Sequence, residues 1–268
     1  AELAELMGEE NDYLARYEAM KETVNRVAWD GEWYARATMD DGRFLGVKRE
    51  PMAKIWLNAQ TWAVLSGMAP AQRAHQAMDS VRRYLNTPLG IKKIDPAMAD
   101  YPTPEDPLTY YNKGCGENGS VFCHANAWAV IAECLLGRGE RAWEYYSQLL
   151  PMNAQAKAGE WRYKAEPYVY SSNIFGPESD KFGLANVSWL TGTAAWMYVA
   201  FTQYLLGVKP VWGGLSIEPC LPPQWESIEI TRIFRGCRYH IRVKNGEKLF
   251  IPHEEGRTNY ERTDATTI

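Results

Sequence analysis

The chain has 268 residues, with 29 basic and 33 acidic side chains and a net charge of −4. At ~150 residues per domain, this length allows one large domain or two modest ones. The acidic balance argues against nucleic acid as the main partner, because duplex binding needs clustered cations. The sequence has no apolar run of the ~18 residues that a membrane span needs, and it shows no export leader. We therefore expect a cytoplasmic protein with no membrane segment.

The cysteines are scattered and form no CxxC pair: Cys115, Cys123, Cys134, Cys220 and Cys237. Such thiols are typical of a reducing compartment, and we interpret them as buried, small apolar side chains. His75, His240 and His253 have no partner at metal-ligand spacing, so we predict no metal site. Eleven Trp and sixteen Tyr beside seven Phe favour surfaces that are half apolar and half wet, as a sugar requires. The alternative is that most of these rings belong to the core.

Apolar residues recur at helical spacing along most of the chain. Glu2 to Val27 is predicted as one helix, followed by a loop or short strand at 28–34. The stretch 86–118 is rich in proline and predicted as irregular, and 152–190 as a long loop of the kind that is usually functional. Further helices, most of them closed by glycine or proline, are predicted at 53–66, 71–85, 122–136, 140–150 and 193–206.

After Pro210 apolar and polar residues alternate, which predicts strands at 215–219, 228–234 and 239–243. Helices joined alternately by short and long loops favour an α/α toroid. We therefore predict a mainly α protein followed by a short C-terminal β segment. Its expected parts are a helical region at 1–210, a small β region at 211–250 and a weakly ordered tail at 251–268.

Asp30 is the first candidate for catalysis, because Trp29 and Trp33 flank it and Gly31 gives close backbone access. A carboxyl between indole rings is partly removed from water, which raises its pKa and keeps it protonated. Such a carboxyl is a general acid for a glycosidic oxygen. Glu32 competes for this role, and the alternative for Asp30 is an ordinary turn aspartate.

A glycine-rich turn at 113–123 leads to the second candidate, with Glu117 and Asn118 at the mouth of the next helix. His124 is expected in the first turns of that helix. A helix N-terminus attracts anions through its partial positive charge and free N–H groups. The alternative for His124 is a hydrogen-bonded core histidine.

Thr191, Gly192 and Thr193 form the third candidate, again directly before an apolar helix. A hydroxyl and a glycine N–H there would supply half of a phosphate cradle. The alternative is that Thr191 or Thr193 is a normal N-cap. The pattern GxxxxGK[ST] is absent from the sequence, so nucleotide binding is not predicted.

Six motifs occur in order along the chain: Ala28-Trp-Asp-Gly-Glu-Trp-Tyr-Ala-Arg36, Gln60-Thr-Trp62, Glu117-Asn-Gly-Ser-Val-Phe-Cys-His-Ala-Asn126, Glu166-Pro-Tyr-Val-Tyr170, Ser188-Trp-Leu-Thr-Gly-Thr-Ala-Ala-Trp196 and Phe234-Arg-Gly236. Together they resemble the inverting disaccharide phosphorylases of glycoside hydrolase family ninety-four, the cellobiose and chitobiose phosphorylases. The resemblance covers roughly residues 1–245.

The resemblance implies cleavage of a β-linked disaccharide by inorganic phosphate, giving an α-sugar 1-phosphate with inversion and using no cofactor. It implies that residues 1–210 are the C-terminal portion of an (α/α)6 catalytic barrel. Asp30 would be the acid, while His124, Thr191 and Gly192 would hold the phosphate. The family has a Tyr shortly before Glu-Asn-Gly that lines the acceptor site, and Tyr111 is its match here.

Further substrate contacts are expected at Trp29 or Trp33, on which the donor sugar would rest, and at Glu117. In the family a polar residue often follows the fourth motif and contacts the acceptor, which points to Ser172 here. Gly116 stands where many members have a lysine that reaches the acceptor, so this chain departs from the family there.

Family enzymes are much longer than this chain, so the resemblance implies an upstream segment of the same enzyme as a partner. A half barrel exposes its inner helix faces and needs such a cover. Family members are commonly dimers, and a homodimer is expected. Two alternatives stay open: an inverting hydrolase with Glu117 or Glu166 as the second acid, and a catalytically silent, sugar-binding fragment.

Overall fold

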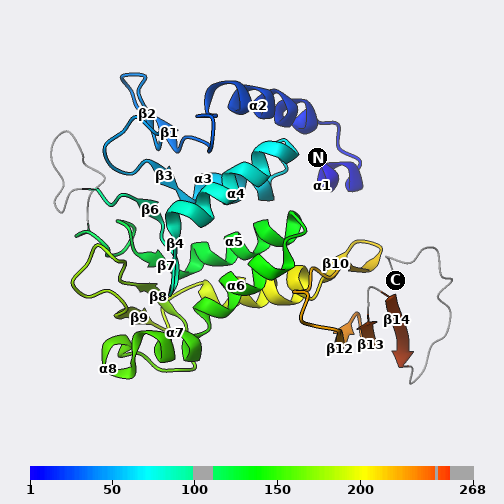
Figure 1. Cartoon of the computed structure of the whole chain (residues 1–268). Helices are drawn as coiled ribbons and strands as arrows, with labels where there is room; N and C mark the ends of the chain where they lie inside the picture. Colours follow the sequence, from blue (N-terminus) through cyan, green and yellow to red (C-terminus); the bar gives the residue numbers. More distant parts are fainter. Residues whose placement is uncertain (99–110, 245–246, 254–268) are drawn as a thin grey trace.

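The computed structural model describes residues 1–98, 111–244 and 247–253, and its helices pack in two layers around α5 (Cys123–Leu135) (Figure 1). The first layer contains α3 (Leu57–Leu65), α5 and α9 (Thr193–Val199), the last continued by the π-helical turn η1 (Ala200–Leu205). The second layer contains α4 (Ala71–Leu85), packed on α3, and α6 (Gly139–Leu149), packed on α5.

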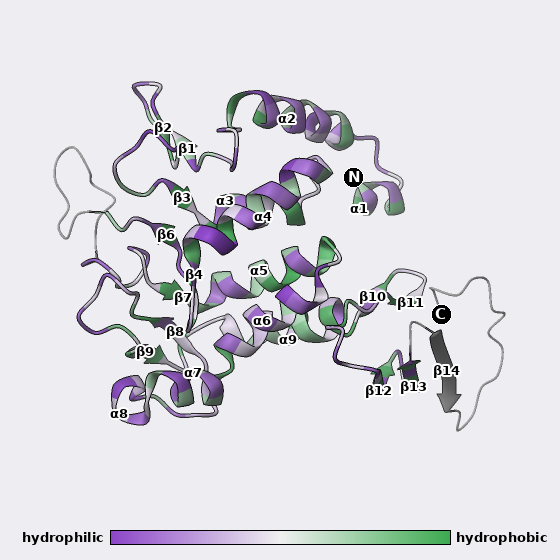
Figure 2. Ribbon diagram, viewed as in Figure 1, coloured by the Kyte–Doolittle hydropathy of each residue, from purple (hydrophilic) through white to green (hydrophobic). Residues whose placement is uncertain are grey.

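The composition of α5 explains why it forms the centre. Ten of its 13 residues are buried, and four of those are alanines. Small side chains let neighbouring helices approach closely, and α3, α6, α9 and η1 all contact α5. By contrast, α4 buries one stripe of residues and shows hydrophilic residues on the face seen in Figure 2, as an outer-layer helix should.

Short antiparallel strands gather at one end of the helices, on the left of Figure 1. Three of them lead into the first layer: β3 (Ile55–Trp56) precedes α3, β7 (Val121–Phe122) precedes α5, and β9 (Ala185–Ser188) comes shortly before α9. β3 pairs with β6 (Ile94–Asp95), and β7 and β9 flank β8 (Ser171–Ile174) in one sheet. The remaining small pairs are β1 (Ala37–Thr38) with β2 (Phe44–Leu45), and β4 (Asn86–Thr87) with β5 (Gly90–Ile91).

A separate small core holds the C-terminal β region. Val208, Leu215 and Ile217 come from β10 (Val208–Val211) and β11 (Gly214–Ile217), and they pack with residues of β13 (Cys237–Lys244). β13 lies between β12 (Ser227–Phe234) and β14 (Glu247–His253) in an antiparallel sheet. The strands predicted after Pro210 are thus confirmed, although the β region already begins at Val208.

One prediction about the ends of the chain is wrong. The helix predicted over 2–27 is two helices, α1 (Glu2–Leu6) and α2 (Tyr13–Val27). Gly8 has a positive φ of 68° that ends the first, and the Asn11 side chain accepts a hydrogen bond from the Tyr13 N–H at the start of the second. Strand β14 begins in the predicted β region and extends to His253, three residues into the predicted tail, while 254–268 lie outside the described residues, so the weakly ordered tail stays a prediction.

The stretch 152–190 is not a plain loop, because it contains α7 (Pro151–Ala158), α8 (Glu160–Tyr163), β8 and β9. The helix predicted at 53–66 begins at Leu57, since Ile55 and Trp56 pair with β6 instead. The helices predicted at 71–85, 122–136, 140–150 and 193–206 are confirmed within one residue at each end. Within the described residues no helix has the length and apolarity needed to cross a bilayer.

Candidate active site

The loop that carries Asp30 is fixed by the two helices beneath it. Gln60 of α3 is fully buried; its Nε2 donates to the Tyr34 carbonyl at 2.9 Å, and its Oε1 accepts from the Tyr34 N–H at 2.8 Å. Gln76 of α4 donates to the Gly31 carbonyl at 2.9 Å. The loop is therefore positioned by side chains that are distant in sequence, which is how a catalytic residue on a loop is held in place.

Asp30 is half-buried, and its Oδ2 accepts a hydrogen bond from the backbone N–H of Lys48 at 2.6 Å. Glu32, the competitor from the sequence, forms an ion pair with the Lys48 ammonium at 3.0 Å. The carboxylate of Glu32 is thus already balanced by a cation, and this favours Asp30 for the acid role.

The two tryptophans beside Asp30 have different surroundings. Trp33 is 4% exposed, and its Nε1 donates to the carbonyls of Gly46 and Lys54 at 3.1 and 2.9 Å. Trp33 is therefore a core residue, and its predicted role as a rest for the donor sugar is wrong. The sequence of the motif does not show whether an indole ring faces the core or the solvent.

Trp29 is half-buried, so part of its ring stays accessible. Its ring lies at an edge angle to the Tyr34 ring, with centroids 4.9 Å apart, and the Arg73 guanidinium lies 5.0 Å from its centroid. The role predicted for Trp29 in sugar binding stays a prediction.

His124 is the second residue of α5, as predicted, and it touches the loop before α9. A Cβ added to Gly192 would lie 2.9 Å from Cε1 of His124, so a side chain at position 192 would collide with the imidazole ring. The ring also packs against Trp128 and Trp196, at centroid distances of 5.0 and 6.1 Å. Two of the residues predicted to hold phosphate are therefore in contact, although they are far apart in sequence.

The surroundings of the His124 imidazole disfavour its charged form. Removal from water lowers its pKa, and the nearby ammonium of Lys93 lowers it further. Its Nε2 is buried and has no hydrogen-bond partner among the described residues. Buried ring nitrogens normally have a partner, so this one has capacity left for a ligand or a water molecule.

Gly192 is the N-cap of α9, so the alternative that Thr191 or Thr193 takes that position is wrong. The Oγ1 of Thr191 accepts from the Thr193 N–H at 3.2 Å and shares a hydrogen bond with the Thr193 hydroxyl at 2.6 Å. A hydroxyl has one donor and two acceptor positions, so these contacts do not exhaust its capacity to bind phosphate.

The sheet formed by β7, β8 and β9 explains why the predicted site residues converge. β7 leads into His124, β9 leads into Thr191, and Ser172 lies in β8 between these strands. Antiparallel pairing fixes their register, so three segments that are far apart in the sequence meet at one end of the helical layers.

Tyr111 covers the position at which the chain departs from the family. Gly116 has a φ of 52°, and a Cβ there would lie 2.7 Å from the Tyr111 ring. No larger side chain fits at position 116 while Tyr111 keeps this place. The carbonyl of Tyr111 accepts from Nδ2 of the buried Asn118 at 2.8 Å, and the Tyr111 side chain is 47% exposed.

Glu117 forms an ion pair that the sequence did not indicate. Its Oε2 lies 2.6 Å from Nζ of Lys93, whose side chain is 7% exposed. The signal that could have found this lysine is its setting between Ile91 and Ile94, because a lysine in an apolar run is buried only when it is paired.

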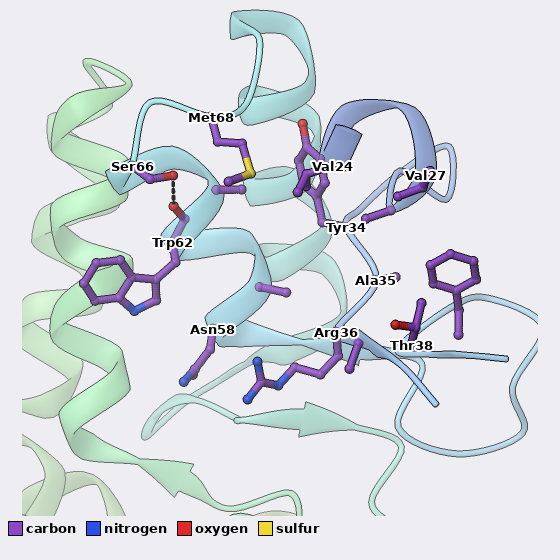
Figure 3. A pocket seen from close by; sticks show the side chains of 15 residues that line it. Val24, Val27, Tyr34, Ala35, Arg36, Thr38, Asn58, Trp62, Ser66 and Met68 are labelled. Carbon is purple, nitrogen blue, oxygen red and sulfur yellow. Dashed lines mark hydrogen bonds between the residues drawn. The ribbon is translucent and has the colours of Figure 1, made fainter. Parts of the chain in front are cut away.

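A cavity of about 540 Å³ lies between α2, α3 and the β1–β2 hairpin (Figure 3). Most of its lining is apolar, and Arg36 and Asn58 lie at the same end of it. Oδ1 of Asn58 is buried and lacks a hydrogen-bond partner in the described part of the chain. Arg36 belongs to the Asp30 motif but received no role from the sequence, and it brings a cation to this cavity.

A row of indole rings connects this cavity to His124. Trp62 of α3 lines the cavity and lies edge-on to Trp128, with centroids 5.3 Å apart, and Trp128 in turn packs on His124. No hydrogen bond or ion pair joins Asp30 to His124 among the described residues, and Asp30 is not one of the residues that line the cavity. The described residues include no cluster of three or more His, Cys, Asp or Glu side chains suited to a metal ion.

Known proteins resemble this chain in sequence, and a solved structure resembles it in fold. An N,N'-diacetylchitobiose phosphorylase of Vibrio furnissii is 41% identical over 258 residues, which cover 94% of this chain and 32% of that enzyme. A solabiose phosphorylase of Paenibacillus borealis is 38% identical over 226 residues, covering 84% of this chain and 29% of the relative. A solved sialidase structure matches the fold with a TM-score of 0.61 at 10% identity, over 93% of this chain and 23% of that one.

The chain spans less than a third of the length of these curated relatives. Residues 210–257 match the C-terminal domain of glycosyl hydrolase family 65, which corresponds to the β region. Residues 1–207, with Asp30, His124 and Gly192, match the catalytic domain of the glycosyl hydrolase 94 superfamily, and the chain belongs to that family.

Proposed function

We propose that this chain forms the acid-and-phosphate part of an inverting phosphorylase that cleaves a β-linked disaccharide. The observation that carries the proposal is the contact between His124 of α5 and Gly192 before α9. That contact places a buried ring nitrogen, which has no hydrogen-bond partner among the described residues, beside Gly192, and the hydroxyl of Thr191 belongs to the preceding residue; such a set suits an oxyanion. The names of the relatives support the same reaction class.

In the proposed reaction Asp30 gives its proton to the interglycosidic oxygen as the bond from that oxygen to the anomeric carbon breaks. A phosphate oxygen attacks the same carbon from the opposite face, which yields an α-sugar 1-phosphate and a free sugar. General acid help contributes typically ~10²–10⁴-fold. Holding the phosphate at His124, Thr191 and Gly192 supplies further acceleration through proximity and orientation.

Phosphate makes a second catalytic carboxylate unnecessary. Inverting hydrolysis needs a base to activate water, whereas phosphate is already an anion. Glu117 is ion-paired with Lys93, and Glu166 is half-buried and accepts from Nε1 of Trp189 at 3.0 Å. Hydrogen bonds from its own backbone and from Trp189 lower the pKa of Glu166, which makes it a weaker base. These contacts favour the phosphorylase over the hydrolase alternative.

The rest of the enzyme follows from the proposal. An upstream region would complete an (α/α)6 barrel and close over Trp62, which is 42% exposed on the first helical layer. Tyr111, Glu117, Ser172 and Trp29 would contact the sugars. Arg36 would add a cation to the cavity wall. A cytoplasmic homodimer that uses no cofactor is part of the same proposal.

The experiment supplies a β-linked disaccharide to the chain, alone and together with the upstream region of a relative, with and without inorganic phosphate. Phosphorus NMR then follows the products. The proposal expects an α-sugar 1-phosphate that forms only when phosphate is present. Two free sugars formed at the same rate without phosphate would support the hydrolase. No turnover in any combination would support the silent fragment.

A further inference from the structure

Two adjacent lysines, Lys92 and Lys93, are buried in the segment between β5 and β6. Buried lysines are rare and need a partner. Lys92 has two carboxylate partners, Asp95 and Glu178, and these lie in its own segment and in the loop before β9. Its pairing accounts for its burial. Lys93 differs, because its one ion-pair partner among the described residues is Glu117, whose side chain is 52% exposed.

The backbone of Lys93 is fixed on both sides. Its N–H donates to the Ser120 carbonyl at 2.8 Å, and its own carbonyl accepts from the Leu57 N–H at 2.9 Å. Lys93 therefore sits between the start of α3 and the segment that leads into α5. Its ammonium also lies over the ring of Phe122, 4.5 Å from the ring centroid, in a cation–π contact. These contacts hold the ammonium of Lys93 at one position.

From this place Lys93 reaches both halves of the candidate site. Its Nζ is 2.6 Å from Oε2 of Glu117, at the mouth of α5. Its charge also acts on His124, where it is the second cause of the lowered pKa after removal from water. The other groups that pack on the His124 ring in the described structure are uncharged: Trp128, Trp196 and Gly192.

We propose that Lys93 is a positioning residue, which orients the carboxylate of Glu117 toward the sugar and keeps a positive charge beside the phosphate at His124. This inference rests on the proposed function. A half-exposed carboxylate needs no partner in order to be tolerated, so the pair is not required for the burial of Glu117. Glu117 without its partner would sample several rotamers, and sugar binding would have to restrict them again.

The test compares three variants of the chain. Lys93→Met removes the charge but keeps an apolar stem against Phe122, and Lys93→Arg keeps the charge. Lys157→Met, on the exposed side of α7, is the matched control for losing a surface lysine. With the upstream region present, we expect Lys93→Met to raise KM for disaccharide and phosphate about tenfold, the size typical of a lost charge-assisted contact. Lys93→Arg should recover most of this loss, and Lys157→Met should leave KM unchanged.

A second readout does not depend on turnover. The sequence has four histidines, so His124→Gln identifies the His124 signal in an NMR pH titration of the 268-residue chain. Lys93→Met should raise the pKa of His124 toward its ordinary value, whereas Lys93→Arg and Lys157→Met should leave it in place. The same chains are checked by thermal melting.

The outcomes separate the two proposals. If the unchanged protein makes no sugar phosphate, the phosphorylase proposal fails, while the titration of His124 still tests Lys93. If Lys93→Met changes neither KM nor the pKa of His124, the inference is overturned. It is also overturned if Lys93→Met and Lys93→Arg lower kcat and the melting temperature equally, because a purely structural lysine would behave in that way.

Discussion

Both ends of α5 bury polar groups, but the charged side chains around these groups differ. At the N-terminal end, Nε2 of His124 and Nε1 of Trp128 are buried without a hydrogen-bond partner among the described residues. At the C-terminal end, both carboxylate oxygens of the fully buried Glu133 also lack a hydrogen-bond partner among the described residues, but the guanidinium groups of Arg138 and Arg141 each lie 3.6 Å from them.

The two ends differ in the charges that lie around these buried polar atoms. The C-terminal end supplies its own counter-charges, and Asp79 joins them at 2.8 Å from Arg138 and 2.6 Å from Arg141. At the N-terminal end, the atoms that lack a partner among the described residues are nitrogens of neutral rings. Unmet hydrogen-bonding capacity in a native protein is rare and is expected where something else binds. The proposed phosphate site uses the first end, whereas the second end holds a carboxylate between cations.

The largest expected effect is at Asp30. Asp30→Asn removes the proton donor and keeps the shape, so phosphorolysis and reverse synthesis should both fall by ~10²–10⁴-fold. Initial rates in both directions measure this. Glu32→Gln is the control, because its carboxylate is paired with Lys48, and it should change the rate much less. Substantial turnover in Asp30→Asn would remove Asp30 from the acid role.

Glu133 tests the structural end of the comparison. Burial raises its pKa from 4.5 to about 7, against the lowering effect of Arg141 and Arg138. The folded state then binds more protons than the unfolded state between these values, so stability is lost as pH rises from 4.5 through about 7. At ~1.4 kcal/mol per pH unit the loss reaches about 3 kcal/mol.

Urea unfolding of the protein and of Glu133→Gln at several pH values checks this. Glu133→Gln should lack the fall in unfolding free energy, whereas Glu22→Gln, on the exposed surface of α2, should show it in full. Parallel pH profiles for all three proteins would show that Glu133 titrates near its ordinary pKa.

His124 tests the functional end. His124→Ala removes a ring nitrogen from the phosphate and should raise KM for phosphate about tenfold, a typical effect for one hydrogen bond to a charged group. KM for the disaccharide should change less. Equal changes in both KM values would indicate a core histidine whose loss disturbs the whole site.

Gly192 gives the smallest of these effects. In Gly192→Ala the new Cβ would lie 2.9 Å from the His124 ring, so the ring must shift and KM for phosphate should rise severalfold. Overpacking of this kind typically lowers the free energy of unfolding by ~1–3 kcal/mol. Gly213→Ala is the matched control, since a Cβ there meets nothing within 4 Å. If the two variants have the same KM for phosphate, the contact between Gly192 and His124 has no part in binding.

The sequence was most informative where structure is local. The amphipathic stripe of 71–85 predicted α4 with its correct ends. The break at Gly8 was missed, because apolar residues continue at helical spacing on both sides of that glycine. For the site, the family motifs led to Asp30, His124 and Gly192.

The parts of the site that depend on distant contacts could not be predicted. Gln60 binds the backbone of Tyr34 in the Asp30 loop, 26 residues away in the sequence. Lys93 pairs with Glu117 from another segment. Their partners are set by packing rather than by neighbouring sequence. The sugar-binding role predicted for Trp33 was wrong for the same reason, because hydrogen bonds from Nε1 to the carbonyls of Gly46 and Lys54 hold its ring in the core.

A phosphate titration followed on the histidine signals tests the central claim most directly. The chain, with the upstream region of a relative present, is titrated with inorganic phosphate at constant ionic strength while imidazole NMR signals are recorded. The account predicts a saturable shift of His124, with His75 and His240 unchanged and the shift weakened in Gly192→Ala. Equal, non-saturating shifts of all the histidines, or none at His124, would contradict an oxyanion site at the start of α5.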